Sequence, residues 1–175
     1  MVEEREEEKW LKECLKVFPE LGKDIKIKCF YKKTPRKCLG RVMGRVDTKK
    51  DIDVESLLFE GKVKKKIVRK KPGRYEIEIN KNLKRIKRKA IRKQVVQYVI
   101  VHELLHIANE DILVLSKDYS RRKKKKIHVK DFKKEFFRRY NELRKLNNLP
   151  QISKQEDLNL AINKILEKYK VMEEK

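Results

Sequence analysis

The chain has 175 residues, 44% of them charged and 39% hydrophobic, which excludes collagen-like, low-complexity and disordered classes. Its 50 lysines and arginines outnumber 27 acidic residues and give a net charge of +23. This excess predicts non-specific contact with DNA or RNA, the alternative being a basic surface that is only solvated. No apolar run approaches the roughly 18 residues of a membrane span, and no secretory signal is recognisable, so we expect a cytoplasmic protein with no membrane contact.

Hydrophobic periodicity in the first half of the chain predicts one helix followed by a strand-rich region. The expected elements are a helix over 2–21 and strands over 25–29, 39–46, 52–59, 63–69 and 75–79. Gly40 and Gly44 within the second strand suggest a bulge or a close backbone approach. The three cysteines, Cys14, Cys29 and Cys38, form no CxxC pair and are expected to be reduced.

The second half of the chain has the period of helices. A helical stripe begins at Leu83, and residues 95–108 are uncharged apart from Glu103 and two histidines, which is typical of a buried helix. An amphipathic helix over 131–146 follows, and Ser153 with Glu156 predicts a capping box that opens a last helix. We expect one α+β domain over 1–175: an N-terminal helix (1–22), a core with a small, mostly antiparallel sheet packed on the buried helix (25–147), and a C-terminal helix (153–173).

The motif His102-Glu103-Leu104-Leu105-His106 carries the chemistry. Histidines four apart on a helix project from one face, so both imidazoles can bind a single zinc ion. Glu103 can then reach a water on that metal, and it can accept the proton of this water as the water attacks a carbonyl. The motif predicts one Zn²⁺ per chain, with Glu103 as the general base.

A catalytic zinc site needs a third protein ligand and one open position. We expect His128, the remaining histidine, because it lies just before a helix that can pack beside the zinc-binding helix. Two histidines and a carboxylate also form a valid ligand set, so Glu135, Asp131 and Asp118 remain alternatives.

The residues from Tyr98 to Asn109, followed by Ile-His-Val-Lys-Asp-Phe at 127–132, resemble the zincin core of the SprT-like and YgjP-like metallopeptidases. They are also similar to the archaeal minigluzincins. The resemblance covers residues 25–147, and it includes, more loosely, a Leu-Gly strand at Leu39-Gly40.

This resemblance implies a zincin-like fold, with a helix and a small sheet before the HExxH helix. It also implies a third ligand from a segment such as His128 to Phe132, whereas the minigluzincins would place Glu135 there. The stretch between His106 and His128 is longer than in YgjP-like proteins. SprT-like proteins of eukaryotes cleave proteins crosslinked to DNA, so the resemblance implies that substrate class as well.

Basic residues cluster in three segments, 62–71, 81–93 and 121–126. These clusters could converge on one phosphate-binding surface, and the alternative is that they are spread over solvated faces. The last cluster is an unbroken basic run that we expect to contact nucleic acid: Arg121, Arg122, Lys123, Lys124, Lys125 and Lys126.

We therefore expect a zinc metalloendopeptidase that acts on protein or peptide, near DNA if the basic clusters bind it. The alternative is a basic nucleic-acid-binding protein whose zinc site is structural, latent or autoinhibited. Tyr119, Tyr140 and Tyr31 are candidate donors to the oxyanion of the transition state, although Tyr140 continues an apolar helix face and fits the core better.

Overall fold

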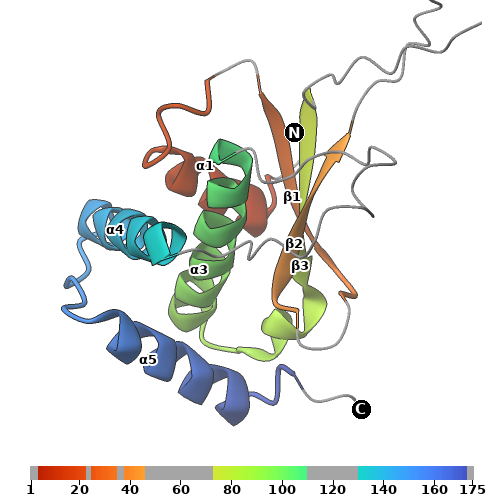
Figure 1. Ribbon diagram of the computed structural model, residues 1–175. Helices are drawn as coiled ribbons and strands as arrows, with labels where there is room; N and C mark the ends of the chain where they lie inside the picture. Colours follow the sequence, from red (N-terminus) through yellow and green to blue (C-terminus); the bar gives the residue numbers. More distant parts are fainter. Residues whose placement is uncertain (1–3, 23–24, 35–37, 46–72, 110–129, 173–175) are drawn as a thin grey trace, which may run out of the picture.

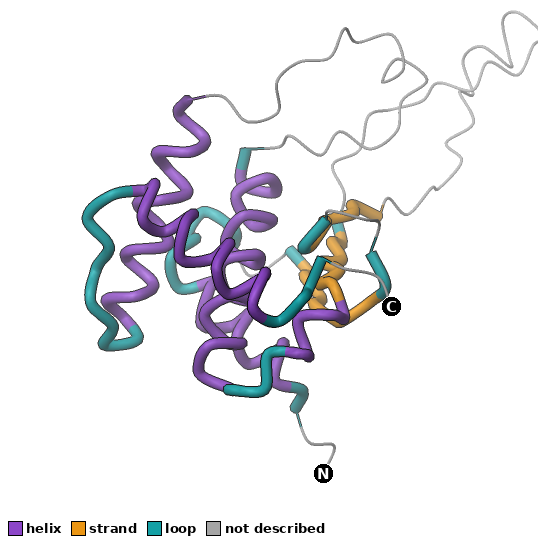
Figure 2. Tube along the Cα trace, turned by 90° about the horizontal axis from the view of Figure 1, so that it is seen from below, coloured by secondary structure: helices purple, strands orange, loops and turns teal. Residues whose placement is uncertain are grey.

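The computed structural model describes residues 4–22, 25–34, 38–45, 73–109 and 130–172. In chain order they form α1 (Glu6–Leu15), β1 (Lys26–Lys32), β2 (Gly40–Arg45), β3 (Arg74–Asn80), the 3-10 helix η1 (Lys81–Arg85), α3 (Lys89–Ala108), α4 (Lys130–Leu146) and α5 (Gln155–Lys168). The α+β class predicted from the sequence is confirmed, and the helices lie to one side of a three-stranded sheet (Figures 1 and 2). The strands expected over 52–59 and 63–69 lie outside the described residues.

Helix α3 is the central element of the fold. It contacts α1 and α4 on one side and β2 and β3 on the other, and it stands between the sheet and α4 in Figure 1. Val95, Ile100 and Leu104 are fully buried, as the nearly uncharged segment predicts. Among the described residues, no helix is both long and apolar enough to cross a membrane.

The sheet has the strand order β1-β3-β2, with β1 parallel and β2 antiparallel to β3. Among the described strands the sheet is mixed rather than mostly antiparallel, because one pair is parallel and the other antiparallel. The chain reverses between β1 and β2, and these strands do not pair with each other. A third strand inserted between two opposed strands must run parallel to one of them and antiparallel to the other. The register of β2 runs unbroken from Gly40 to Arg45, so it contains no bulge.

The inner face of the sheet is apolar and packs on the helices. Cys29 of β1 and Ile77 and Ile79 of β3 have no exposed surface, while the alternate positions carry charges such as Lys28 and Glu76. This period of two is the pattern from which the strands were predicted.

Glu78 lies on the outer face of the sheet, yet its side chain is fully buried. It accepts hydrogen bonds from Lys32 on β1 and Arg41 on β2, which tie both outer strands to β3. Burial by itself would raise the pKa of Glu78, but the hydrogen bonds from these two cations outweigh it and hold the pKa below its ordinary value.

The helical stripe predicted from Leu83 is broken in two. Leu83 belongs to η1, the chain is extended at Ile86 and Arg88, and α3 begins only at Lys89. Leu83 and Ile86 are both fully buried, so the apolar positions were identified correctly but their helix was not. Residues three apart share a face in 3-10 and α-helices alike, and this spacing cannot distinguish them.

Two helix termini also differ from the prediction. Helix α1 ends at Leu15, and bonds between residues three apart replace its last turns, because Pro19 lacks the N–H that would continue the helix. Helix α5 begins at Gln155 with Lys154 as its N-cap and no side-chain cap, so the capping box of Ser153 and Glu156 is not formed.

All three cysteines are free, as predicted. Cys14 and Cys29 are buried in the core, and Cys38 precedes β2. Burial raises the pKa of the Cys38 thiol, which donates to the carbonyl oxygen of Gly40 at 2.7 Å.

Candidate metal centre

Residues His102, Glu103 and His106 lie in the last two turns of α3. Their backbone is held by the apolar contacts of the helix, with Leu104 and Leu105 buried between the two histidines. Glu103 and His106 are themselves 7% and 9% exposed. The three side chains are therefore fixed on a rigid element, as a preorganised site requires.

The two imidazoles converge. Nε2 of His102 lies 3.3 Å from Nε2 of His106, and the ring planes are inclined by 80°. Two nitrogens bound to one tetrahedral zinc at about 2.0–2.1 Å would be roughly 3.3 Å apart. The pair therefore fits a single zinc ion. Within the described residues, no third histidine, cysteine or carboxylate completes a metal-binding group with them.

Glu103 accepts a hydrogen bond from the backbone N–H of Val42 on β2. Burial raises the pKa of its carboxyl to about 7, although the Val42 N–H opposes this shift. A carboxyl that titrates near neutral pH suits a general base, which must both accept and release a proton.

Gly40 explains how β2 comes close enough to reach Glu103. A Cβ atom at this position would lie 2.3 Å from Cγ1 of Val99 and 3.2 Å from the carbonyl oxygen of Glu78. Only glycine fits between α3 and β3 at this distance. The close backbone approach predicted for this strand is confirmed at Gly40.

Aromatic side chains of α4 cover the histidines. The ring of Phe132 lies 4.7 Å from His106 and 5.2 Å from His102, and Phe136 lies 5.7 Å from His102, between ring centroids. The sequence indicates that this helix can pack beside the zinc-binding helix, but it does not single out these phenylalanines. Their contact with both imidazoles supports the orientation of the two rings.

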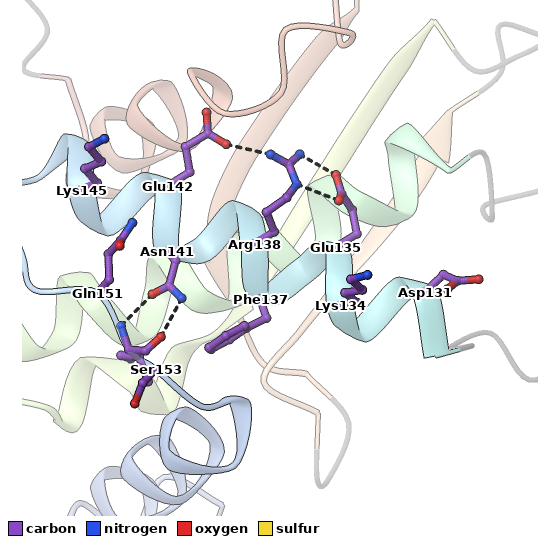
Figure 3. Close-up of a pocket in the computed structure, with 11 residues that line it drawn as sticks. Asp131, Lys134, Glu135, Phe137, Arg138, Asn141, Glu142, Lys145, Gln151 and Ser153 are labelled. Atoms are coloured by element: carbon purple, nitrogen blue, oxygen red, sulfur yellow. Dashed lines mark hydrogen bonds and ion pairs between the residues drawn. The ribbon is translucent and has the colours of Figure 1, made fainter.

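Glu135 is paired with two arginines of its own helix. It accepts two hydrogen bonds from Arg138, at 2.8 and 2.9 Å (Figure 3). It also accepts one from Arg139 at 2.7 Å. The hydrogen bonds from Arg138, and then those from Arg139, lower the pKa of Glu135 to about 2 despite its partial burial. Asp131 is exposed and projects outward from the start of α4 (Figure 3). The structure brings neither carboxylate to the histidine pair.

An open groove of about 1000 Å³ runs along the outer side of α4 and the loop that follows it (Figure 3). Its lining includes Glu135, Arg138, Asn141 and Glu142 but none of the HExxH residues. The groove is therefore separate from the candidate metal centre.

Two of the tyrosines considered as oxyanion donors, Tyr140 and Tyr31, lie elsewhere. Tyr140 is 2% exposed and donates to the carbonyl oxygen of Gln94 at 3.1 Å, so it belongs to the core, as expected. Tyr31 packs under Lys84 of η1, at the opposite end of α3 from the histidines. Burial raises the pKa of Tyr31 well above its ordinary range.

Several predicted site residues lie outside the described residues: His128, Asp118, Tyr119 and the basic run Arg121, Arg122, Lys123, Lys124, Lys125 and Lys126. The structure neither supports nor contradicts their predicted roles.

No protein-family model matches the chain. Comparisons with curated proteins and with solved structures also found no match.

We predict that Gly40→Ala destabilises the protein by about 1–3 kcal/mol, because the added methyl group collides with Val99. Val99→Ala should recover part of this loss in the double variant, since it removes the colliding atom. The matched control is Gly73→Ala, where nothing lies within 4 Å of the added Cβ and the change should be near neutral. Urea unfolding measures all three, and equal stabilities of the Gly40 and Gly73 variants would contradict the close approach.

We also predict that the free energy of unfolding of the metal-free protein falls as the pH rises from 4.5 to about 7. In this window the folded state, with its raised Glu103 pKa, binds more protons than the unfolded state. Glu103→Gln abolishes this titration, so it should stabilise the metal-free protein at about pH 8, by at most about 3 kcal/mol, and have little effect near pH 4.5.

The control for this measurement is Glu135→Gln, whose effect should have the opposite sign. The pKa of Glu135 is lowered to about 2, so its ion pairs stabilise the fold above its unfolded pKa, and this contribution is lost as the pH falls toward 2. The variant should be modestly less stable at about pH 8, since the side chain is 34% exposed. A pH-independent effect of Glu103→Gln would refute the raised pKa.

Proposed function

We propose that this protein is a zinc-dependent peptidase in which Glu103 acts as the general base. The observation that carries the proposal is the convergence of His102 and His106 beside a buried carboxylate whose pKa lies near 7. A structural site needs no such base, and a site of this composition leaves room for substrate.

We assign His102, His106 and His128 as the zinc ligands. The ring of Phe132 contacts both imidazoles, and His128 lies four residues before Phe132 in the sequence. Four residues of chain span at most about 14 Å, which limits the distance between the Cα atoms of His128 and Phe132. The main rival, Glu135, would have to leave two arginines to reach the metal. The bound zinc would act as a Lewis acid that polarises water and the substrate carbonyl.

In the proposed reaction, the protein side chain that takes part directly is Glu103, which transfers one proton. The Glu103 carboxylate accepts a proton from the attacking water and can return it to the leaving amine. The Val42 N–H holds the carboxyl in place, and the aromatic rings of α4 exclude solvent from one side of the histidines. These groups are positioned before substrate arrives.

The edge of β2 supports an extended peptide as the substrate. Among the described strands, β2 pairs only with β3, and the Val42 N–H that reaches Glu103 lies on its other edge. Gly44, two residues further on, presents its backbone along that same edge. A substrate segment could add to this edge as another strand, which would place its backbone beside the catalytic carboxylate.

We predict that the purified protein binds about one zinc ion per chain and that His102→Ala, His106→Ala and His128→Ala each weaken this binding strongly. Glu135→Gln, in contrast, should retain the metal, because this side chain is engaged by arginines. Elemental analysis after dialysis measures the zinc content of the wild type and of each variant. Retained zinc in the His128 variant together with lost zinc in the Glu135 variant would identify the glutamate as the third ligand.

We predict that Glu103→Gln keeps the zinc and the fold but loses peptide hydrolysis by about 10²–10⁴-fold, since the general base is removed. Glu142→Gln, an exposed change on α4, is the matched control and should be fully active. The assay is cleavage of an unfolded protein substrate.

This assay also tests the alternative function, a basic nucleic-acid-binding protein with a structural, latent or autoinhibited zinc site. That alternative requires zinc binding without hydrolysis by the wild type, even after limited removal of terminal segments. Hydrolysis that survives in the Glu103 variant would refute the proposed mechanism.

A further inference from the structure

Basic side chains gather at the end of the molecule where α3 begins. Lys81, Lys84, Lys87 and Arg88 lie within eight residues, on η1 and on the link to α3, and all four are exposed. We call this group the basic end. Figure 1 shows η1 at the lower end of the sheet, close to the C-terminal end of α5.

Contacts with distant parts of the chain fix the basic end in place. Nζ of Lys84 lies 4.6 Å from the centre of the Tyr31 ring on β1. Asn82 donates to the carbonyl oxygen of Val171 at 3.0 Å, and Arg85 donates to that of Lys170, so the segment after α5 is also bound here. These cations therefore stand on a rigid platform.

The positive charge of the basic end is not neutralised by the described residues. The sequence has no acidic residue between Glu78 and Glu103. The nearest acid of α1, Glu6, is engaged by Lys89 at 2.8 Å and by Arg92 at 3.0 Å. No described acidic side chain pairs with any of the four basic-end cations, although acids neutralise many basic residues elsewhere on the surface.

We propose that the basic end binds the phosphate backbone of duplex nucleic acid, without sequence preference. Four clustered cations that pair with no described acidic side chain, on a rigid platform, suit a regular array of phosphates. A single strand would be bound through stacking of its bases on aromatic rings. No aromatic residue is among the exposed large hydrophobic side chains of the described residues, and the Tyr31 ring lies beneath Lys84.

The bound duplex lies far from the candidate metal centre. Arg88 and His102 are fourteen positions apart, and an α-helix rises about 1.5 Å per residue, so roughly 21 Å separates them along α3. The duplex would dock at one end of the helix and leave the histidine end free. This binding does not depend on the proposed peptidase activity.

The test is the salt dependence of binding to a short DNA duplex of arbitrary sequence, from about 50 to 200 mM salt. The quadruple variant Lys81→Gln, Lys84→Gln, Lys87→Gln and Arg88→Gln should reduce the slope of log affinity against log salt by about 3.6, since each phosphate contact contributes about 0.9. The double variant Lys81→Gln with Lys87→Gln, which keeps the Tyr31 contact, should reduce it by about 1.8.

The matched control removes the same charge elsewhere, through Lys133→Gln, Lys134→Gln, Lys145→Gln and Lys154→Gln, which are exposed positions on and after α4. It should leave the slope nearly unchanged. Equal losses in the control and the quadruple variant would show a general effect of net charge and would overturn the proposal. Tighter binding of a single strand than of the duplex would also overturn it, as would binding to phosphatidylserine vesicles without binding to the duplex. Circular dichroism confirms that each variant is folded.

Discussion

The close contact between β2 and α3 at Gly40 and Val99 is the constraint on which the candidate site depends. Here the missing Cβ of Gly40 lets the strand approach, and two residues later the Val42 N–H meets Glu103. The packing that closes the core at this point therefore also supplies the donor that holds the Glu103 carboxyl.

Helix α3 has two chemically different ends separated by an apolar middle. Fully buried residues such as Val95, Ile100 and Leu104 fix the helix between the sheet and α4. This leaves its first turn in a basic environment and its last two turns beside Phe132 and Phe136. The helix of 20 residues is about 30 Å long, so its two ends are well separated.

The sequence predicts best those features that depend on local spacing. His102 and His106 share a helix face because they are four residues apart, and Tyr140 fits the core because it continues an apolar helix face. The parallel pairing of β1 with β3 could not be predicted, because alternation marks a strand but not its neighbour. The start of α5 after Lys154 could not be predicted either, because no side-chain hydrogen bond caps this terminus.

The hydrogen-bond donor of Glu103 was equally hidden, because it is a backbone N–H and any residue could supply it. Only the three-dimensional approach of β2 identifies Val42. Gly40 was the single signal in the sequence, and it indicated a close approach without indicating what would be approached.

The two glutamates considered for the metal centre carry the same carboxyl group, but their surroundings give them different properties. Glu103 is buried with one backbone donor, and its pKa is about 7; Glu135 faces two guanidinium groups, and its pKa is about 2. A base must gain and lose a proton near neutral pH, which only the first can do. A ligand must be free to turn toward the metal, and the second would give up charge-assisted hydrogen bonds to do so. Phe132 of α4 contacts both imidazoles, and His128 lies four residues before it, which is why we propose His128 as the third ligand.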